Sequence, residues 1–253
     1  MTQTQVAEKE APLKELTMLG RGERSRVNMV IYGRSGAGKT YRAATAPSPY
    51  LVAFDPKGHD SVPFQIPGEL TETLADVVEQ VEWFEAGNHI KYGIKTFIGD
   101  GLNFVHDMFL KETGEYMVNT MGAKDPDLMP IAGQMKILRA YKRLMLRIVN
   151  LTQLEPKELR VHVVLTCLDE HVKDDEKAPF QIRPLFGSRS MNQTFPALFS
   201  TIGYIEPVGE DEEGKLTTER KMLFTEYRGI LARDRLGIFP LAGEAPNLSE
   251  YLK

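Results

Sequence analysis

The sequence predicts an α/β fold in which a mostly parallel central sheet is flanked by helices and followed by a C-terminal antiparallel hairpin. Two observations lead to this expectation. Short apolar runs typical of buried strands alternate with segments of helical periodicity along most of the 253 residues. The last two apolar runs are separated by the acidic, glycine-bounded stretch 209–214, which is typical of a solvated hairpin turn.

The composition indicates one domain. Apolar residues make up 42% of the chain and charged residues 26%, and this length suffices for one sizeable core. We expect residues 1–25, a mixed polar segment, to be a flexible N-terminal arm and residues 26–253 to be a single domain. No stretch resembles a membrane span or a signal peptide, so we expect a cytoplasmic protein without membrane contacts.

Cysteine, histidine and charge narrow the classes of function. The single cysteine, Cys167, allows no internal disulfide, and five scattered histidines lack the spacing of a zinc site, so we expect no structural metal. The net charge of -4 is mild. Nucleic-acid binding would therefore need a local basic surface.

The stretch Gly33-Arg34-Ser35-Gly36-Ala37-Gly38-Lys39-Thr40 follows the first predicted strand, residues 26–32, and opens a short helix that Pro47 ends. Pattern and context both match the phosphate-binding P-loop. Its backbone N–H groups point at phosphate oxygens, Lys39 reaches the β and γ phosphates, and the Thr40 hydroxyl can bind Mg²⁺. The alternative is a glycine-rich turn with a chance lysine. The expected nucleotide-binding residues are Gly33, Ser35, Gly36, Ala37, Gly38, Lys39, Thr40 and Tyr41.

A second strand over residues 50–54 ends at Asp55, and apolar residues at helical spacing predict an amphipathic helix over residues 69–86. A third strand, residues 94–98, runs into Asp100 before a helix at 102–115. Ligands of open parallel sheets gather at the carboxyl ends of the strands, so Asp100 is the expected partner of Thr40 at Mg²⁺. The alternative is that Asp100 merely caps the following helix.

A long helix is expected over residues 132–154. No acidic residue occurs from Leu128 to Leu154, and the basic residues Lys136, Arg139, Arg143 and Arg147 follow spacings of three and four, which places them on one face. This face could follow a phosphate backbone, dock on an acidic neighbouring subunit, or be an ordinary solvated surface.

The next strand, residues 161–166, precedes a long segment, residues 167–193, for which we expect irregular structure. Its first half is acidic. Its second half mixes Arg183 and Arg189 with phenylalanines, a combination that suits single-stranded nucleic acid. The apolar runs 202–205 and 221–224 are the strands of the C-terminal hairpin, and the chain then reaches Arg233 and Arg235.

Taken in order, these parts resemble the RecA-type P-loop ATPase core. The motifs that carry the resemblance are the P-loop, the acidic loop 55–60, Asp100, the loop and helix 117–154, the strand 161–166 with its loop, and Arg233-x-Arg235-x-Gly237. The resemblance covers residues 27–240. It is strongest to small phage-encoded RecA-like nucleotide-binding proteins of the single-strand annealing and recombination kind.

The resemblance implies a weak ATPase that uses ATP and Mg²⁺ and forms a homo-oligomeric ring or filament. It implies nucleotide-dependent binding of single-stranded DNA in support of annealing or strand pairing, with a single-strand-binding protein as a further partner and the host cytoplasm as the location. Residues 121–134 and 169–193 would face DNA. The implied DNA contacts are Lys136, Arg139, Arg143, Arg183 and Arg189.

Arg233 and Arg235 match the position of a paired basic finger that, in RecA-like assemblies, reaches the nucleotide of the adjacent subunit. Without a neighbour they would be an exposed basic strand that pairs with Asp234 or Glu226. The implied catalytic residues are Lys39, Asp55, Asp100, Arg233 and Arg235.

One departure concerns the catalytic base. RecA-like enzymes usually carry Asp-x-Glu after the second strand, whereas this chain has Asp55-Pro56-Lys57. A lysine cannot serve as a base at neutral pH without a large pKa shift. Asp55, His59 and Asp60 remain as alternatives, and slow hydrolysis or a nucleotide-gated regulatory or structural role without DNA binding becomes the alternative function.

A small GTPase is the alternative from another class. Asp55-Pro-Lys-Gly58 fits the Asp-x-x-Gly switch, and Thr166 to Asp169 is near the guanine reader, although Cys167 replaces its lysine. Only residues 41–54 separate the P-loop from Asp55, whereas Ras-like domains need roughly 40 residues there. A small-molecule kinase would need a lid and an acceptor site, and neither can be identified.

Overall fold

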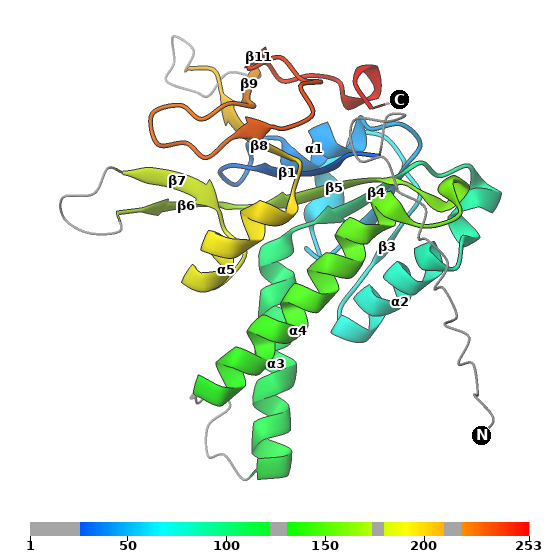
Figure 1. The fold of residues 1–253 in the computed structure, drawn as a ribbon, viewed down its shortest axis with the longest axis vertical. Helices are drawn as coiled ribbons and strands as arrows, with labels where there is room; N and C mark the ends of the chain where they lie inside the picture. The colour runs from blue at the N-terminus through cyan, green and yellow to red at the C-terminus, as the bar shows by residue number, and fades with distance from the viewer. Residues whose placement is uncertain (1–25, 122–130, 174–179, 210–218, 253) are drawn as a thin grey trace, which may run out of the picture.

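The computed structural model describes residues 26–121, 131–173, 180–209 and 219–252. These residues form a central sheet in the order β11-β9-β8-β1-β5-β4-β2-β3, with β10 paired to β8 and a separate hairpin of β6 and β7. Figure 1 shows the helices packed around this sheet, with the α3–α4 pair extending away from it. The expected arm, residues 1–25, lies outside the described residues.

The parallel part of the sheet contains β1 (Asn28–Tyr32), β2 (Pro49–Ala53), β3 (Gly68–Leu70), β4 (Thr96–Asp100), β5 (His162–Cys167) and β8 (Thr201–Pro207). Every residue of β1, β4 and β5 is buried, as expected for strands covered on both faces. Strand β5 lies between β1 and β4. The P-loop, directly after β1, and Asp100, at the end of β4, are therefore separated by the width of one strand.

The C-terminal strands are antiparallel, as the sequence predicts. Strand β9 (Arg220–Leu223) pairs with β8, β11 (Ala242–Glu244) pairs with β9, and the short β10 (Arg233–Asp234) pairs with the beginning of β8. The fold is therefore a mixed α/β sheet with mostly parallel strands, in agreement with the predicted fold class.

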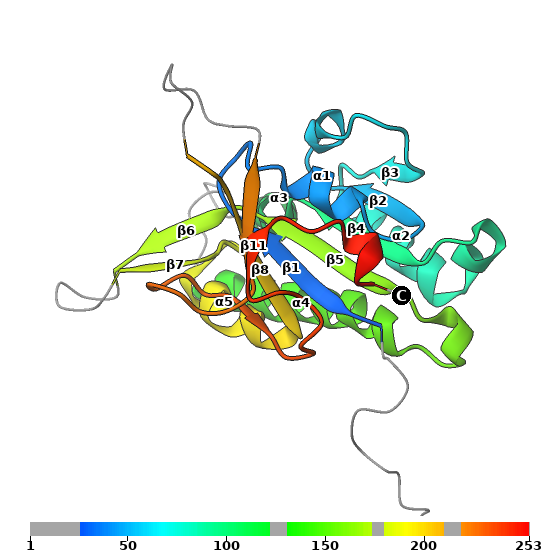
Figure 2. The same ribbon diagram turned by 90° about the horizontal axis from the view of Figure 1, so that it is seen from above.

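Two hydrophobic cores cover the two faces of the sheet. Alternate residues of β1 point to opposite faces, so Val30 and Tyr32 lie in one core and Met29 and Ile31 in the other. The larger core is closed by α2 (Leu74–Glu85), α3 (Leu102–Met121), α4 (Ile131–Asn150) and α5 (Arg189–Thr194), and the smaller by α1 (Lys39–Ala44) and the C-terminal segment. Figure 2 shows α1 and α4 on different sides of the strands.

The predicted helix over residues 69–86 is wrong at its beginning. Residues Gly68–Leu70 form β3, which pairs with β2, and α2 begins only at Leu74. The Thr73 hydroxyl accepts a hydrogen bond from the Asp76 N–H at 3.2 Å, and the Asp76 carboxylate accepts one from the Thr73 N–H at 2.9 Å. This capping box sets the beginning of the helix. Leu70 lies at helical spacing from the apolar residues of α2 but belongs to β3.

The predicted irregular segment 167–193 is also wrong, because most of its described residues are regular. Strand β6 (Asp169–Val172) pairs with β7 (Gln181–Pro184), and α5 follows after Ser188, whose hydroxyl caps it. Each strand has only four residues, and β6 carries a single apolar residue, Val172, so the sequence lacks an apolar run long enough to indicate a strand.

The long predicted helix over residues 132–154 begins at Ile131 and ends at Asn150, with a 3₁₀ turn over Leu151–Gln153. The expected DNA-facing loop 121–134 falls largely outside the described residues. In the described part of the chain, no helix combines the length and apolar character that crossing a membrane requires.

Candidate nucleotide site

The loop after β1 has the backbone of a phosphate cradle. Gly33, Gly36 and Gly38 all have positive φ angles, of 157°, 75° and 90°. A Cβ atom on Gly33 would lie 2.2 Å from the carbonyl oxygen of Ile205 in β8, so only glycine fits where the loop leaves the sheet. Helix α1 begins at Lys39 directly after Gly38, which directs the first N–H groups of the helix into the loop.

Lys39 lies across this loop. Its Nζ donates to the carbonyl oxygens of Gly33, at 3.0 Å, and Arg34, at 2.8 Å. Burial lowers the pKa of Lys39, and neighbouring acidic groups that include Cys167 and Asp100 partly oppose this shift. A partly buried cation with flexible reach can stabilise phosphate oxygens strongly.

Three side chains from three elements meet beside Lys39. The Thr40 hydroxyl lies 2.9 and 3.1 Å from the two carboxylate oxygens of Asp100, and the Thr166 hydroxyl at the end of β5 donates to the same carboxylate. The Thr166 oxygen also accepts from the Gly101 N–H at 3.0 Å. Asp100 is 3% exposed; burial raises its pKa, whereas the hydroxyls of Thr166 and Thr40 and the charge of Lys39 lower it.

The structure therefore brings the predicted pair Thr40 and Asp100 into contact. Among the described residues, the hydrogen bonds of the Asp100 side chain go to Thr40 and Thr166, and not to the first turn of α3 that the capping alternative requires. The Asp-x-x-Gly aspartate of the GTPase alternative, Asp55, does not take this place beside Thr40. A hydroxyl and a carboxylate side by side are hard oxygen ligands of the kind that Mg²⁺ prefers.

The loop after β2 closes on this cluster. Gly58 lies so near that a Cβ on it would be 2.2 Å from Oδ2 of Asp100. The Asp55 carboxylate accepts from the Lys57 N–H at 2.9 Å, and Asp55 and Lys57 both line the cavity beside the P-loop. His59 and Asp60 are exposed and lie 3.4 Å apart, outside that lining. Asp55 is thus the one of the three alternative bases that faces the cavity.

The cavity has a volume of about 330 Å³. The residues around it fit a magnesium nucleotide. The glycine loop and Lys39 can bind phosphate, and the Thr40–Asp100 pair can bind Mg²⁺. There is also room for the ligand, because a Cβ on Gly36 would meet no atom within 4 Å. Bound Mg²⁺ would neutralise charge on the phosphate oxygens. Tyr41, also expected at the nucleotide, is 37% exposed and packs against Phe64, with 6.2 Å between the ring centroids.

Arg233 and Arg235 lie far from the P-loop of the same chain. Strand β10 pairs with Thr201 and Ile202, the register partners of Met29 and Val30 near the beginning of β1, whereas the P-loop follows the end of β1. The Arg233 guanidinium donates to the carbonyl oxygens of Pro196 and Phe199, the latter at 3.1 Å, and so does not pair with Asp234 or Glu226. Arg235 is exposed.

The predicted DNA contacts fall into two groups. Lys136, Arg139, Arg143 and Arg189 are exposed, the first three on α4. Arg183 is 5% exposed, and its Nε donates to Glu170 at 2.9 Å, so it does not lie on an open surface. Arg147, the last member of the basic face, pairs with Glu85 at 2.7 Å and Glu82 at 3.4 Å.

Sequence reasoning named Thr166 and Gly58 only within the GTPase alternative and missed them as neighbours of Asp100. Thr166 is a polar residue next to the end of a buried strand, the same signal that pointed to Asp100, and β5 lies next to β1 and β4. No local signal predicts that Gly58 approaches Asp100, because this contact depends on how two loops pack.

Fold and site together define an α/β P-loop NTPase. Residues 25–236 match the family described as AAA domain. The match spans most of the chain, so the chain belongs to the AAA-domain family and is a nucleotide-binding P-loop ATPase by class. No curated protein matches the sequence.

Proposed function

We propose that this ATPase is a RecA-like recombination protein that binds single-stranded DNA when Mg²⁺ and ATP are bound, acts as a homo-oligomer, and supports annealing or strand pairing. The observation that carries the DNA part is the exposed portion of the basic face of α4, formed by Lys136, Arg139 and Arg143.

The place of α4 supports nucleotide dependence. Helix α3 begins two residues after Asp100, and the Tyr141 hydroxyl of α4 donates to the carbonyl oxygen of Leu102, the first residue of α3, at 2.9 Å. Lys136 Nζ lies 4.1 Å from the ring centroid of Tyr116 on α3. The two helices extend together from the sheet (Figure 1), so a shift of Asp100 on nucleotide binding would move the basic face.

Asp55 is the proposed base for hydrolysis. Its carboxylate lines the cavity and is oriented by the Lys57 N–H, which leaves one oxygen for a water molecule. Arg235 is the proposed trans-acting contact to the nucleotide of the next subunit, because Arg233 is already engaged by two carbonyl oxygens of its own protomer.

The experiment is a fluorescence-anisotropy titration of a labelled poly(dT) oligonucleotide with and without a slowly hydrolysed ATP analogue. We expect the analogue to tighten binding at least tenfold in the wild type and to have no effect in Lys39→Ala. Replacing Lys136, Arg139 and Arg143 by Gln should make the slope of log K against log salt less negative by roughly 2, at about 0.7 per lost phosphate contact.

A variant with Lys91, Lys95 and Lys157 replaced by Gln loses the same charge away from α4 and should keep the wild-type slope. Equal slopes in the two triple variants would show that α4 does not contact the DNA. If no variant and no nucleotide state binds DNA, Lys57 in place of a glutamate favours the second candidate, a nucleotide-gated regulatory or structural ATPase.

A further inference from the structure

A second polar cavity lies between β7, α5 and the segment 226–233. It has a volume of about 490 Å³, larger than the cavity beside the P-loop. We name it the arginine cavity after the two guanidinium groups in its wall. Its polar lining consists of Gln181, Arg183, Asn192, Gln193, Glu226 and Arg233.

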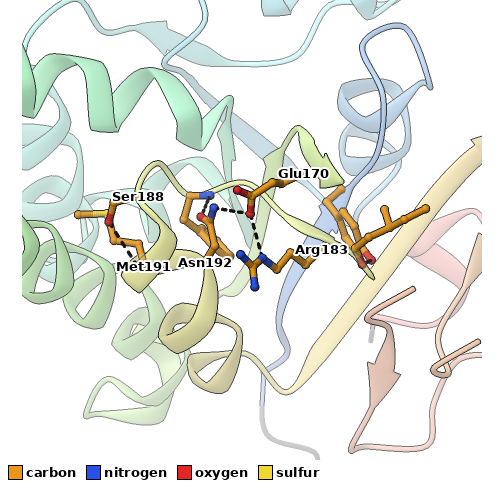
Figure 3. Close-up of polar contacts among 8 residues, drawn as sticks. Glu170, Arg183, Ser188, Met191 and Asn192 are labelled. Atoms are coloured by element: carbon orange, nitrogen blue, oxygen red, sulfur yellow. Dashed lines mark hydrogen bonds and ion pairs between the residues drawn. The ribbon is translucent and has the colours of Figure 1, made fainter. Parts of the chain in front are cut away.

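Arg183 is fixed in this wall by a hydrogen-bond network (Figure 3). Its Nε donates to Oε2 of Glu170 at 2.9 Å, and the same oxygen accepts from Nδ2 of Asn192 at 2.7 Å. Oδ1 of Asn192 accepts in turn from the Phe186 N–H at 2.6 Å. In the network of Figure 3 only Nε of Arg183 takes part, so the two terminal nitrogens are the part of the guanidinium left for a ligand.

Arg233 contributes the second guanidinium. Its Nη2 bonds to two carbonyl oxygens, and its Nε is enclosed and has no hydrogen-bond partner among the described residues. Burial and the charge of Arg235 both lower the pKa of Arg233. A half-enclosed cation bonded only to neutral oxygens is incompletely compensated, and an anion beside it would be stabilised.

The charges of the cavity favour an anion with more than one free oxygen. Glu170 offsets Arg183, no carboxylate contacts Arg233 in the described structure, and Glu226 in the cavity wall is exposed, so water screens its charge. A phosphate monoester carries about −1.5 to −2 charges at neutral pH and three free oxygens, which can accept from the two terminal nitrogens of Arg183 and the remaining terminal nitrogen of Arg233.

We propose that the arginine cavity binds a phosphate monoester of nucleotide size. Inorganic phosphate alone would leave most of 490 Å³ empty, whereas a nucleotide would fill it, with the side-chain amides of Gln181 and Gln193 available to its sugar or base. The monoester can come from a strand end or from a free mononucleotide. The strand-end source rests on the proposed function, and the mononucleotide source does not.

The cavity is tied to the P-loop through Tyr32. This buried residue directly precedes Gly33, and its hydroxyl lies 2.9 Å from the carbonyl oxygen of Leu231 and 3.1 Å from that of Ile182. Leu231 lines the cavity and Ile182 precedes Arg183, so one side chain joins the end of β1 to two walls of the cavity. We therefore expect occupation of one site to affect binding at the other.

The test compares oligo(dT) of about 12 nucleotides, a length that covers a typical single-strand site, with a 5′-phosphate or a 5′-hydroxyl and a 3′-fluorophore. Anisotropy is measured on the full chain at a saturating slowly hydrolysed ATP analogue. In a second arm, AMP and adenosine are titrated calorimetrically into Lys39→Ala, which weakens phosphate binding at the P-loop. We expect the phosphorylated ligand to bind about tenfold tighter in at least one arm.

Arg233→Gln should abolish that difference, and Glu226→Gln, at an exposed position that cannot unfold the protein, should increase it about threefold. Arg228→Gln removes an exposed charge that stacks on Tyr227 nearby and should change nothing. A phosphate effect with oligonucleotides assigns the strand end, and one with AMP alone assigns the mononucleotide. No phosphate preference in either arm, or a preference unchanged in Arg233→Gln and Glu226→Gln, overturns the proposal. Loss of all oligonucleotide binding would contradict the proposed function and leave the AMP arm to decide.

Discussion

Gly58→Ala tests the geometry of the nucleotide site with a single methyl group. The backbone of Gly58 is not in the left-handed region, so alanine is tolerated conformationally, but its Cβ would lie 2.2 Å from Oδ2 of Asp100. Real Cβ atoms essentially never come closer than 3.0 Å to another heavy atom, so loop and carboxylate must separate by about 0.8 Å. Asp100 cannot retreat freely, because the hydroxyls of Thr40 and Thr166 fix it.

The expected cost falls on function. If Asp100 binds the Mg²⁺ of the nucleotide, a displacement of nearly 1 Å should cost about 100-fold in catalysis. Straining one charge-assisted hydrogen bond costs about 1.5–3 kcal/mol, which sets the upper limit on the loss of folding stability. The assay is phosphate release from Mg·ATP as a function of Mg²⁺ concentration, together with thermal unfolding with and without Mg·ATP.

Gly93→Ala is the matched control. Gly93 has a φ of 65° and open space around a Cβ, so alanine should cost about 1–2 kcal/mol of stability through left-handed strain and leave phosphate release unchanged. If Gly58→Ala releases phosphate at the wild-type rate and needs no more Mg²⁺, then Gly58 does not approach Asp100 as described, and the assignment of the Asp100 site loses its geometric basis.

Three further changes probe other groups. Lys57→Glu restores the Asp-x-Glu pattern and should raise ATP turnover at least tenfold, whereas Lys57→Gln should not; equal rates would show that position 57 does not limit hydrolysis. Thr166→Val leaves the Gly101 N–H without its acceptor and removes one of the two hydroxyls that bond to Asp100, so it should lower the free energy of unfolding by about 1–3 kcal/mol, with Thr166→Ser close to wild type in chemical denaturation. Burial lowers the pKa of His89, so near pH 6 the unfolded chain binds more protons than the folded chain. The free energy of unfolding is therefore unaffected by His89 above its ordinary pKa of about 6.5 and declines as the pH falls below that value. His89→Phe, which keeps the stacking on Phe84, should flatten this decline between pH 6.5 and 5 in denaturation curves; an unchanged slope would assign the pH effect to other groups.

Elements of the fold and contacts of the site could be predicted where the signal lies in consecutive residues of the sequence. The P-loop and the strand that runs into Asp100 can each be recognised from consecutive residues. Because ligand-binding groups gather at the carboxyl edge of a parallel sheet, the contact between Thr40 and Asp100 could be expected. The β6–β7 hairpin was missed because its strands are only four residues long and β6 has a single apolar residue, Val172. Gly58 against Asp100 and the Arg183–Glu170–Asn192 network depend on approaches between distant segments, which no local pattern encodes.

Tyr32 and Asp100 give the nucleotide site two separate routes to the rest of the molecule. Asp100 leads into α3 and, through the Tyr141 hydroxyl, to the basic face of α4, while Tyr32 leads to β7 and the arginine cavity. Tyr141→Phe should therefore weaken the effect of nucleotide on binding of a 5′-hydroxyl oligonucleotide and keep the preference for a 5′-phosphate. Tyr32→Phe should do the reverse, and each change deletes one buried hydroxyl at a cost of about 1–3 kcal/mol in the free energy of unfolding. If both variants lose both effects together, the two routes are one, and the coupling runs through the sheet itself.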